Sequence, residues 1–181
     1  LLVADSCENV LAETVARFPG VMHDQIMDVE QQREEAVKLL KPIKNKILFG
    51  LEGNHSLRSW YAAGFSVERW IAEQLGIPFP GLEVIAKISV HKQKYTLHAT
   101  HGTGSTASPA AVFGKLLAQS TRVNGVDVVI RSHHHTKALF ETTVFDGNNG
   151  EQRKVVLAAT GCFMGYINSY GHRQGMRPLV P

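Results

Sequence analysis

Short apolar segments that end in polar, chemically active residues are the feature that most constrains this fold. Four segments with the length and aliphatic content of buried strands cover residues 1–4, 46–51, 94–100 and 126–130. The polar residues at or just beyond their ends are Asp5, Asn54, His55, His101, His133 and His135. In open α/β sheets the carboxyl ends of the strands meet at one edge, so the pattern predicts that these side chains converge.

The segments between the strands predict helices in the first half of the chain. Apolar residues recur on one helical face from about Asp24 to Leu40, and Pro42 is expected to end that helix. A second helical stretch, over residues 57–75, is expected to break near Gly64. Two strands joined by helices are typical of a βαβ unit.

The second half predicts hairpins. Residues 82–90 and 94–100 alternate as two arms of a hairpin that turns at Lys92-Gln93, and a helix is expected from Pro109 to about Arg122. Two further strands are expected over residues 137–145 and 153–159. The chain thus begins with a strand–helix–strand pattern and continues with hairpins. This order predicts an α/β protein with a mixed sheet, or two packed sheets, flanked by helices.

Composition limits the class of protein. A chain of 181 residues, 44% hydrophobic and 19% charged, suits one globular domain over residues 1–181. A net charge of +3 without a basic run does not demand a nucleic-acid partner. Two cysteines make no disulfide framework, which favours a reduced, cytoplasmic setting. No apolar run approaches the roughly 20 residues that span a bilayer, so no membrane partner is expected.

The polar residues at the strand ends form a plausible metal-ligand set. One carboxylate, one amide and three imidazoles suit Mn, Fe or Zn, and they exceed the needs of one tetrahedral site. Two divalent metals bridged by Asp5 would use them all. Single residues also allow simpler interpretations: Asp5 as a helix N-cap, or Asn54 as a turn residue. A hydrolase with one metal on Asp5, His101 and His133 is a further alternative.

In their order along the chain, these residues resemble the signature of the calcineurin-like metallophosphoesterases. That signature is Asp-x-His, Gly-Asp followed by Asn, Gly-Asn-His, a single His and Gly-His-x-His. The matching residues here are Asp5 with Asn9, Gly53-Asn54-His55, His101, and His133 with His135. Ala4 and Ser132 stand where the family has Gly. The segments 160–163 and 166–178 resemble the tail of a phage- and prophage-associated branch.

The Asp-x-His block has no match in the chain. The resemblance therefore implies an N-terminally truncated domain, whose first strand and Asp-x-His would lie about 30 residues upstream. It also implies a four-layer α/β fold, with two mixed sheets packed as a sandwich and helices outside.

The resemblance also implies roles for individual residues. Asp5 would bridge two metals, His135 would join the first metal, and His55 would act as general acid. Asn54, His101 and His133 would hold the second metal. The chemistry of the reaction also allows Arg58 or Arg131 to neutralise a phosphate oxygen of the substrate, and each could equally be a surface charge.

The function implied is hydrolysis of phosphate mono- or diesters by a hydroxide that two metals activate. The alternative is a non-catalytic metal-binding or interaction module on the same scaffold, which the absent Asp-x-His would favour. The substrate stays open among nucleotide, nucleic acid, protein phosphate and small metabolite, and the phage-like tail favours nucleic acid.

Overall fold

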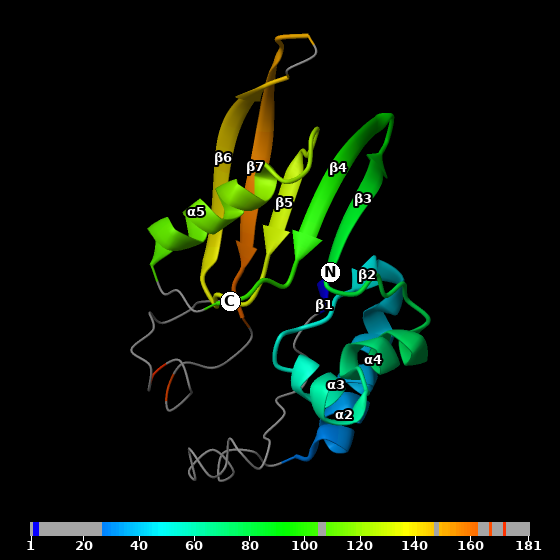
Figure 1. Ribbon diagram of the computed structural model, residues 1–181. Helices are drawn as coiled ribbons and strands as arrows, with labels where there is room; N and C mark the ends of the chain where they lie inside the picture. Colours follow the sequence, from blue (N-terminus) through cyan, green and yellow to red (C-terminus); the bar gives the residue numbers. More distant parts are fainter. Residues whose placement is uncertain are drawn as a thin grey trace. The chain divides into compact units, whose positions relative to one another are not determined.

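The computed structural model describes residues 2–3, 27–104, 108–146, 149–162, 167 and 172 of the chain. Its contacts divide the chain into two compact units, Leu1–Leu82 and Glu83–Pro181. The described residues contain four α-helices, a two-stranded parallel sheet and a five-stranded mixed sheet (Figure 1). The predicted α/β class is confirmed, and the prediction of a single domain stays a prediction.

The first unit is mostly helical. Its two strands are short and pair in parallel, with Leu2 beside Phe49 and Val3 beside Gly50. Its elements are β1 (Leu2–Val3), α2 (Val29–Leu40), the 3₁₀ helix η2 (Lys41–Lys46), β2 (Phe49–Gly50), α3 (Leu57–Ala63) and α4 (Val67–Leu75).

Helix α2 begins at a reciprocal cap. The Asp28 side chain accepts from the Gln31 N–H at 2.8 Å, and the Asp28 N–H donates to Gln31 Oε1 at 3.1 Å. Helix α2 ends at Leu40, as predicted, and Pro42 lies in the first turn of the 3₁₀ helix η2 that follows, where a proline needs no N–H. The strand predicted from Lys46 is therefore shorter, since Lys46 still belongs to η2.

The first unit has its own apolar core. The predicted break near Gly64 is confirmed: Gly64 has a φ of 64° and follows α3, and Ser66 caps α4. Buried core residues are Ile47, Val67, Ile71 and Leu75, with residues of α2 packed against them.

The second unit is a five-stranded sheet with one helix. The strand order is β3-β4-β5-β7-β6, in which both neighbours of β5 are parallel to it and both edge strands are antiparallel to their neighbours. The elements are β3 (Glu83–Val90), β4 (Gln93–Thr100), α5 (Pro109–Ser120), β5 (Val128–Arg131), β6 (Lys137–Phe145) and β7 (Gln152–Thr160). Strand β5 begins two residues later than predicted, because Asp127 lies before it and accepts from the Thr96 N–H at 2.7 Å.

Both faces of this sheet are apolar. Helix α5 lies on one face (Figure 1), where Val112 and Leu116 join a core with residues of β5 and β7. The register places Leu97 and Ala99 beside Val128 and Ile130 on the opposite face. Leu97 and Ala99 are buried and their β5 neighbours are half-buried. A sheet that is apolar on both faces is typical of the interior of an α/β protein.

Among the described residues, no helix is long and apolar enough to cross a membrane.

Candidate functional site

Two imidazoles lie together at one end of the second unit. Strands β4 and β5 run in parallel with Thr100 beside Arg131, so the chain leaves both strands at the same end of the sheet. His101 follows β4 directly, and His133 follows β5 after one residue. Their ring centroids are 5.2 Å apart with the rings at 64°, and His101 is only 5% exposed. Of the residues predicted to converge, the structure brings these two together.

Hydrogen bonds fix the loop after β5 to the ends of two other strands. The Ser132 N–H donates to Thr100 O of β4 at 3.3 Å, and Thr160 Oγ1 of β7 donates to Ser132 Oγ at 3.0 Å. The His134 N–H closes the loop on Ser132 O at 2.9 Å. His133 is thus carried by a loop that three strand ends hold.

The backbone of this loop is unusual. His133 has a φ of 74° and His135 a φ of 53°, in the left-handed region that residues with a side chain seldom adopt. Such conformations cost about 1–3 kcal/mol each and persist where the surroundings enforce them, often at functional sites.

Arg131 connects the loops that follow β4 and β5. Its Nε donates to His134 Nε2 at 3.0 Å, its Nη1 to Gln119 Oε1 at 3.4 Å and its Nη2 to Thr103 O at 3.5 Å. The guanidinium also lies against Gly102, whose φ is 95° and where an added Cβ would be 2.8 Å from Arg131 Nε. Only glycine suits this close approach at that φ.

Burial and neighbouring cations keep His134 neutral. They lower its pKa to about 4, with burial first and then the charges of Lys115, Arg131, His133 and His101. Because Nε2 accepts from Arg131, the proton of the neutral ring lies on Nδ1. Burial and the charge of Arg122 also lower the pKa of Arg131.

The first unit carries the other predicted residues in the turn after β2. The Leu57 N–H and Ser56 Oγ donate to Gly53 O at 3.2 and 3.4 Å, and the Arg58 N–H donates to His55 O at 3.2 Å. Asn54, His55 and Arg58 are half-buried. This turn belongs to the first unit and the imidazole pair to the second.

A buried carboxylate holds this turn to α4. Glu52 is 7% exposed, and its Oε2 accepts from Ser66 Oγ, which in turn accepts from the Arg69 N–H at 3.1 Å. The sequence did not single out Glu52 or Ser66, nor Gln119, Lys115 or Thr160 in the second unit. Of these residues, only Ser66 carries a signal in the sequence, because serine is a common N-cap residue.

Asp5 lies outside the described residues. Within them, no group of three or more His, Cys, Asp or Glu side chains is arranged to hold a metal ion. His101 and His133 are brought together, and His135 lies in the same loop as His133. The roles predicted for these residues stay predictions.

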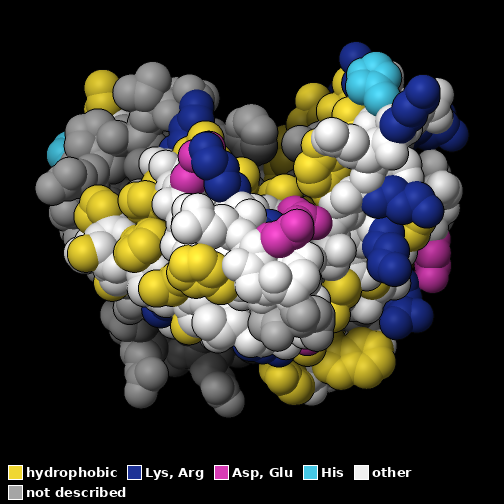
Figure 2. Space-filling model, turned by 90° about the horizontal axis from the view of Figure 1, so that it is seen from above, with side chains coloured by type: hydrophobic (Ala, Val, Ile, Leu, Met, Phe, Trp, Pro, Cys, Tyr) yellow, Lys and Arg dark blue, Asp and Glu magenta, His cyan; other side chains and the backbone are white. Residues whose placement is uncertain are grey.

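Basic side chains gather on another surface of the molecule. Figure 2 shows Lys and Arg side chains on one side of the face seen from above. The hairpin β3–β4 contributes the exposed Lys87, Lys92 and Lys94. Its turn is at the amino end of β4, whereas His101 follows the carboxyl end, about 26 Å away for an eight-residue strand. Lys87 pairs with Thr96 in the middle of β4, about 16 Å from His101 along the strand. These lysines are therefore not part of the imidazole site.

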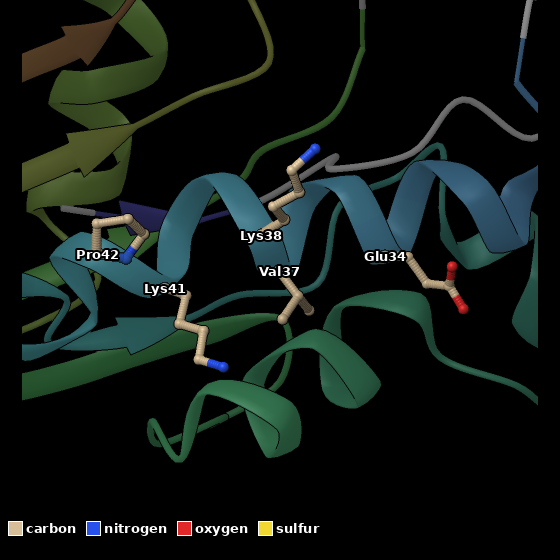
Figure 3. A pocket seen from close by; sticks show the side chains of 5 residues that line it. All are labelled: Glu34, Val37, Lys38, Lys41 and Pro42. Atoms are coloured by element: carbon tan, nitrogen blue, oxygen red, sulfur yellow. The ribbon is translucent and has the colours of Figure 1, made fainter.

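A surface pocket lies along α2 and η2 of the first unit. It is lined by Glu34, Val37, Lys38, Lys41 and Pro42. Figure 3 shows the Lys38 and Lys41 side chains pointing away from each other. No set of polar groups converges there, so the pocket has no chemistry of its own.

The chain matches no known protein-family model, and no curated protein is similar to it at a significant level.

Proposed function

We propose that this chain is a metal-dependent phosphoesterase, which hydrolyses phosphate monoesters or diesters with two divalent metal ions. The observation that carries the proposal is the pairing of His101 and His133, whose ring centroids are 5.2 Å apart at the carboxyl ends of adjacent parallel strands. Metal and phosphate chemistry is commonly built at that edge of an α/β sheet. The resemblance of the motifs at residues 5 to 135 to the calcineurin-like metallophosphoesterases supplies the reaction class.

The donor chemistry of the described residues fits a metal such as Mn, Fe or Zn. Imidazole and amide oxygen are intermediate-to-hard ligands. His101, His133 and Asn54 would hold one metal, while His135 and Asp5 would serve the other, with Asp5 shared. When bound, such ions lower the pKa of water and neutralise charge on phosphoryl oxygens.

The remaining residues would bind the substrate and move a proton. His55 would protonate the departing alkoxide, a general-acid step that typically contributes about 10²–10⁴ in rate. Arg58 or Arg131 would bind a phosphate oxygen. Arg131 is oriented for such a role by three hydrogen bonds.

The proposal includes a sandwich of two mixed sheets flanked by helices. The apolar face opposite α5 supports it, because Leu97 and Ala99 lie on that face and are 4% and 0% exposed. An apolar face needs a covering layer, and a second sheet is one way to provide it.

The experiment is a hydrolysis assay on the protein with Mn²⁺ and both p-nitrophenyl phosphate and its bis ester. His101→Ala and Asn54→Ala should each lower kcat/KM by about 100-fold or more, since loss even of a group that supports a metal ligand costs 10–100-fold. His91→Asn is the matched control, because His91 is an exposed turn residue of the second unit with a φ of 54°, which asparagine tolerates.

The role of His55 has its own test. His55→Ala should slow hydrolysis of an alkyl phosphate about 10²-fold or more, and of p-nitrophenyl phosphate far less, because p-nitrophenolate leaves without a proton. Equal losses on both esters would argue against a general acid. Two equivalents of bound metal without turnover of any ester would favour the non-catalytic module.

A further inference from the structure

Two cations lie against the backbone just beyond His101. Lys115 Nζ donates to Thr103 O at 3.2 Å and to Gly104 O at 3.3 Å, and Arg131 Nη2 also donates to Thr103 O. Gly104 has a φ of 76°, and an added Cβ there would lie 3.3 Å from Lys115 Nζ. Gly102 and Gly104 thus let the two side chains approach the same loop closely.

The positive charge of this pair is not balanced. Among the residues that the structure describes, neither Lys115 nor Arg131 forms an ion pair with a carboxylate. Burial and then the charge of Arg131 lower the pKa of Lys115, as expected for cations that repel one another. An anion bound to both would relieve this repulsion.

The acceptors that hold Arg131 are all neutral. They are the His134 ring, the Gln119 side-chain oxygen and the Thr103 carbonyl. His134 and Gln119 are 5% and 2% exposed, so both are firmly packed. A carboxylate in either place would fix the guanidinium equally well but would neutralise it. Neutral acceptors fix its direction and leave its full charge for a ligand.

Both cations also keep hydrogen-bond donors for a ligand. A guanidinium has five N–H groups and an ammonium has three, and the contacts above leave N–H groups on both without an acceptor among the described residues. The planar guanidinium suits two phosphate oxygens at once.

We propose that Arg131 and Lys115 bind a second phosphate group of the substrate, beside the one that is hydrolysed, and that His134 and Gln119 are positioning residues for Arg131. The identity of the hydrolysed group rests on the proposed function, whereas binding of the anion does not. The substrate would carry neighbouring phosphates, as a nucleic-acid strand or a nucleotide polyphosphate does.

The test is calorimetric binding of inorganic pyrophosphate to the metal-free full chain in the presence of a chelator. The unaltered protein should bind it, and Lys115→Gln and Arg131→Gln should each weaken binding about tenfold. Lys87→Gln removes the same charge from an exposed position of the same unit and should change nothing. No binding, or equal binding by all variants, would overturn the proposal. Because Lys115 lies on the helix surface, its variant decides the question even where Arg131→Gln fails to fold.

The positioning role of His134 is tested by rescue. His134→Gln keeps an acceptor for Arg131 Nε and should bind pyrophosphate nearly as well as the unaltered protein. His134→Leu removes the acceptor and should lose about as much affinity as Arg131→Gln. Equal affinities of these two variants for pyrophosphate would mean that His134 does not position Arg131.

Competition identifies the source of the anion. Displacement of pyrophosphate by a short oligothymidylate would indicate a nucleic-acid strand, and displacement by ATP a nucleotide polyphosphate. Displacement by neither would overturn the substrate class. These binding assays need neither metal nor turnover. Failure of the hydrolysis assay would therefore not argue against the anion site, and success of that assay would not establish it.

Discussion

The two units hold their polar residues by different means. In the first unit, Asn54 and His55 lie in a turn that follows a two-residue strand and is held by backbone bonds and the Glu52–Ser66 contact. In the second unit, His101 follows an eight-residue strand and His133 a four-residue strand, and Arg131 ties their loops together through side chains. The second unit therefore fixes a pair of imidazoles within its own sheet.

The rigidity of such a site depends on how the strands before it are paired. A four-residue parallel ladder inside a five-stranded sheet sets the positions of its strand ends through pairing on both sides, whereas a two-residue strand leaves the following turn dependent on local contacts. Changes in the first unit should therefore act locally, while changes in the second should spread through the sheet.

The largest expected effect is from Leu157→Ala. Leu157 is fully buried in β7, between β5 and β6, and the change should lower the free energy of unfolding by about 2–5 kcal/mol. Hydrogen exchange should show the loss in β5, β6 and β7. Both tryptophans, Trp60 and Trp70, lie in the first unit, so their fluorescence reports on that unit alone.

Because each unit has its own core, the urea midpoint seen by tryptophan fluorescence should move less than the midpoint seen by hydrogen exchange of the sheet. Ile71→Ala in the first unit is the matched control and should give the reverse pattern. Equal shifts by both probes would mean that the two units unfold together.

A smaller effect is expected from pH. The pKa of His134 is about 4 in the folded protein and ordinarily 6.5. Between these values the unfolded chain binds the extra proton, so this contribution to stability is complete above pH 6.5 and is lost as the pH falls toward 4. One such group changes the free energy of unfolding by at most about 1.4 kcal/mol per pH unit.

Urea unfolding of the metal-free protein, followed by circular dichroism from pH 7.5 to 4, measures this slope. His134→Gln cannot titrate and should show a shallower loss of stability over the same range. Parallel curves for the two proteins would contradict the burial of a neutral His134.

The smallest effect on stability is expected from the N-terminal caps of two helices in the first unit. Ser66→Ala removes both the cap of α4 and the donor to the buried Glu52, and should cost about 1–2 kcal/mol. Asp28→Ala removes the exposed cap of α2 in the same unit and should cost about 0.5–1 kcal/mol. Chemical denaturation followed by tryptophan fluorescence compares the two. A larger loss for Asp28→Ala would mean that Glu52 does not depend on Ser66.

Local chemistry in the sequence predicted most of the helices and strands. The break at Gly64, the hairpin over residues 83–100 and the strands over residues 137–145 and 152–160 follow from turn residues and apolar periodicity, which are properties of neighbouring residues. The errors lie where one element runs into the next. The strand expected from Lys46 begins later, because a 3₁₀ helix with Pro42 in its first turn extends to Lys46.

By itself, the sequence determined which residues could do chemistry and that they follow strands. His101, His133 and the turn of Asn54 were all found in this way, because a strand and the polar residue after it are neighbours in the chain. Tertiary structure alone decided that β4 and β5 are parallel neighbours, which brings His101 and His133 together. It also decided that Gln119 and His134 hold Arg131, since contacts between residues far apart in the chain depend on how helix and sheet pack, and no local pattern encodes them.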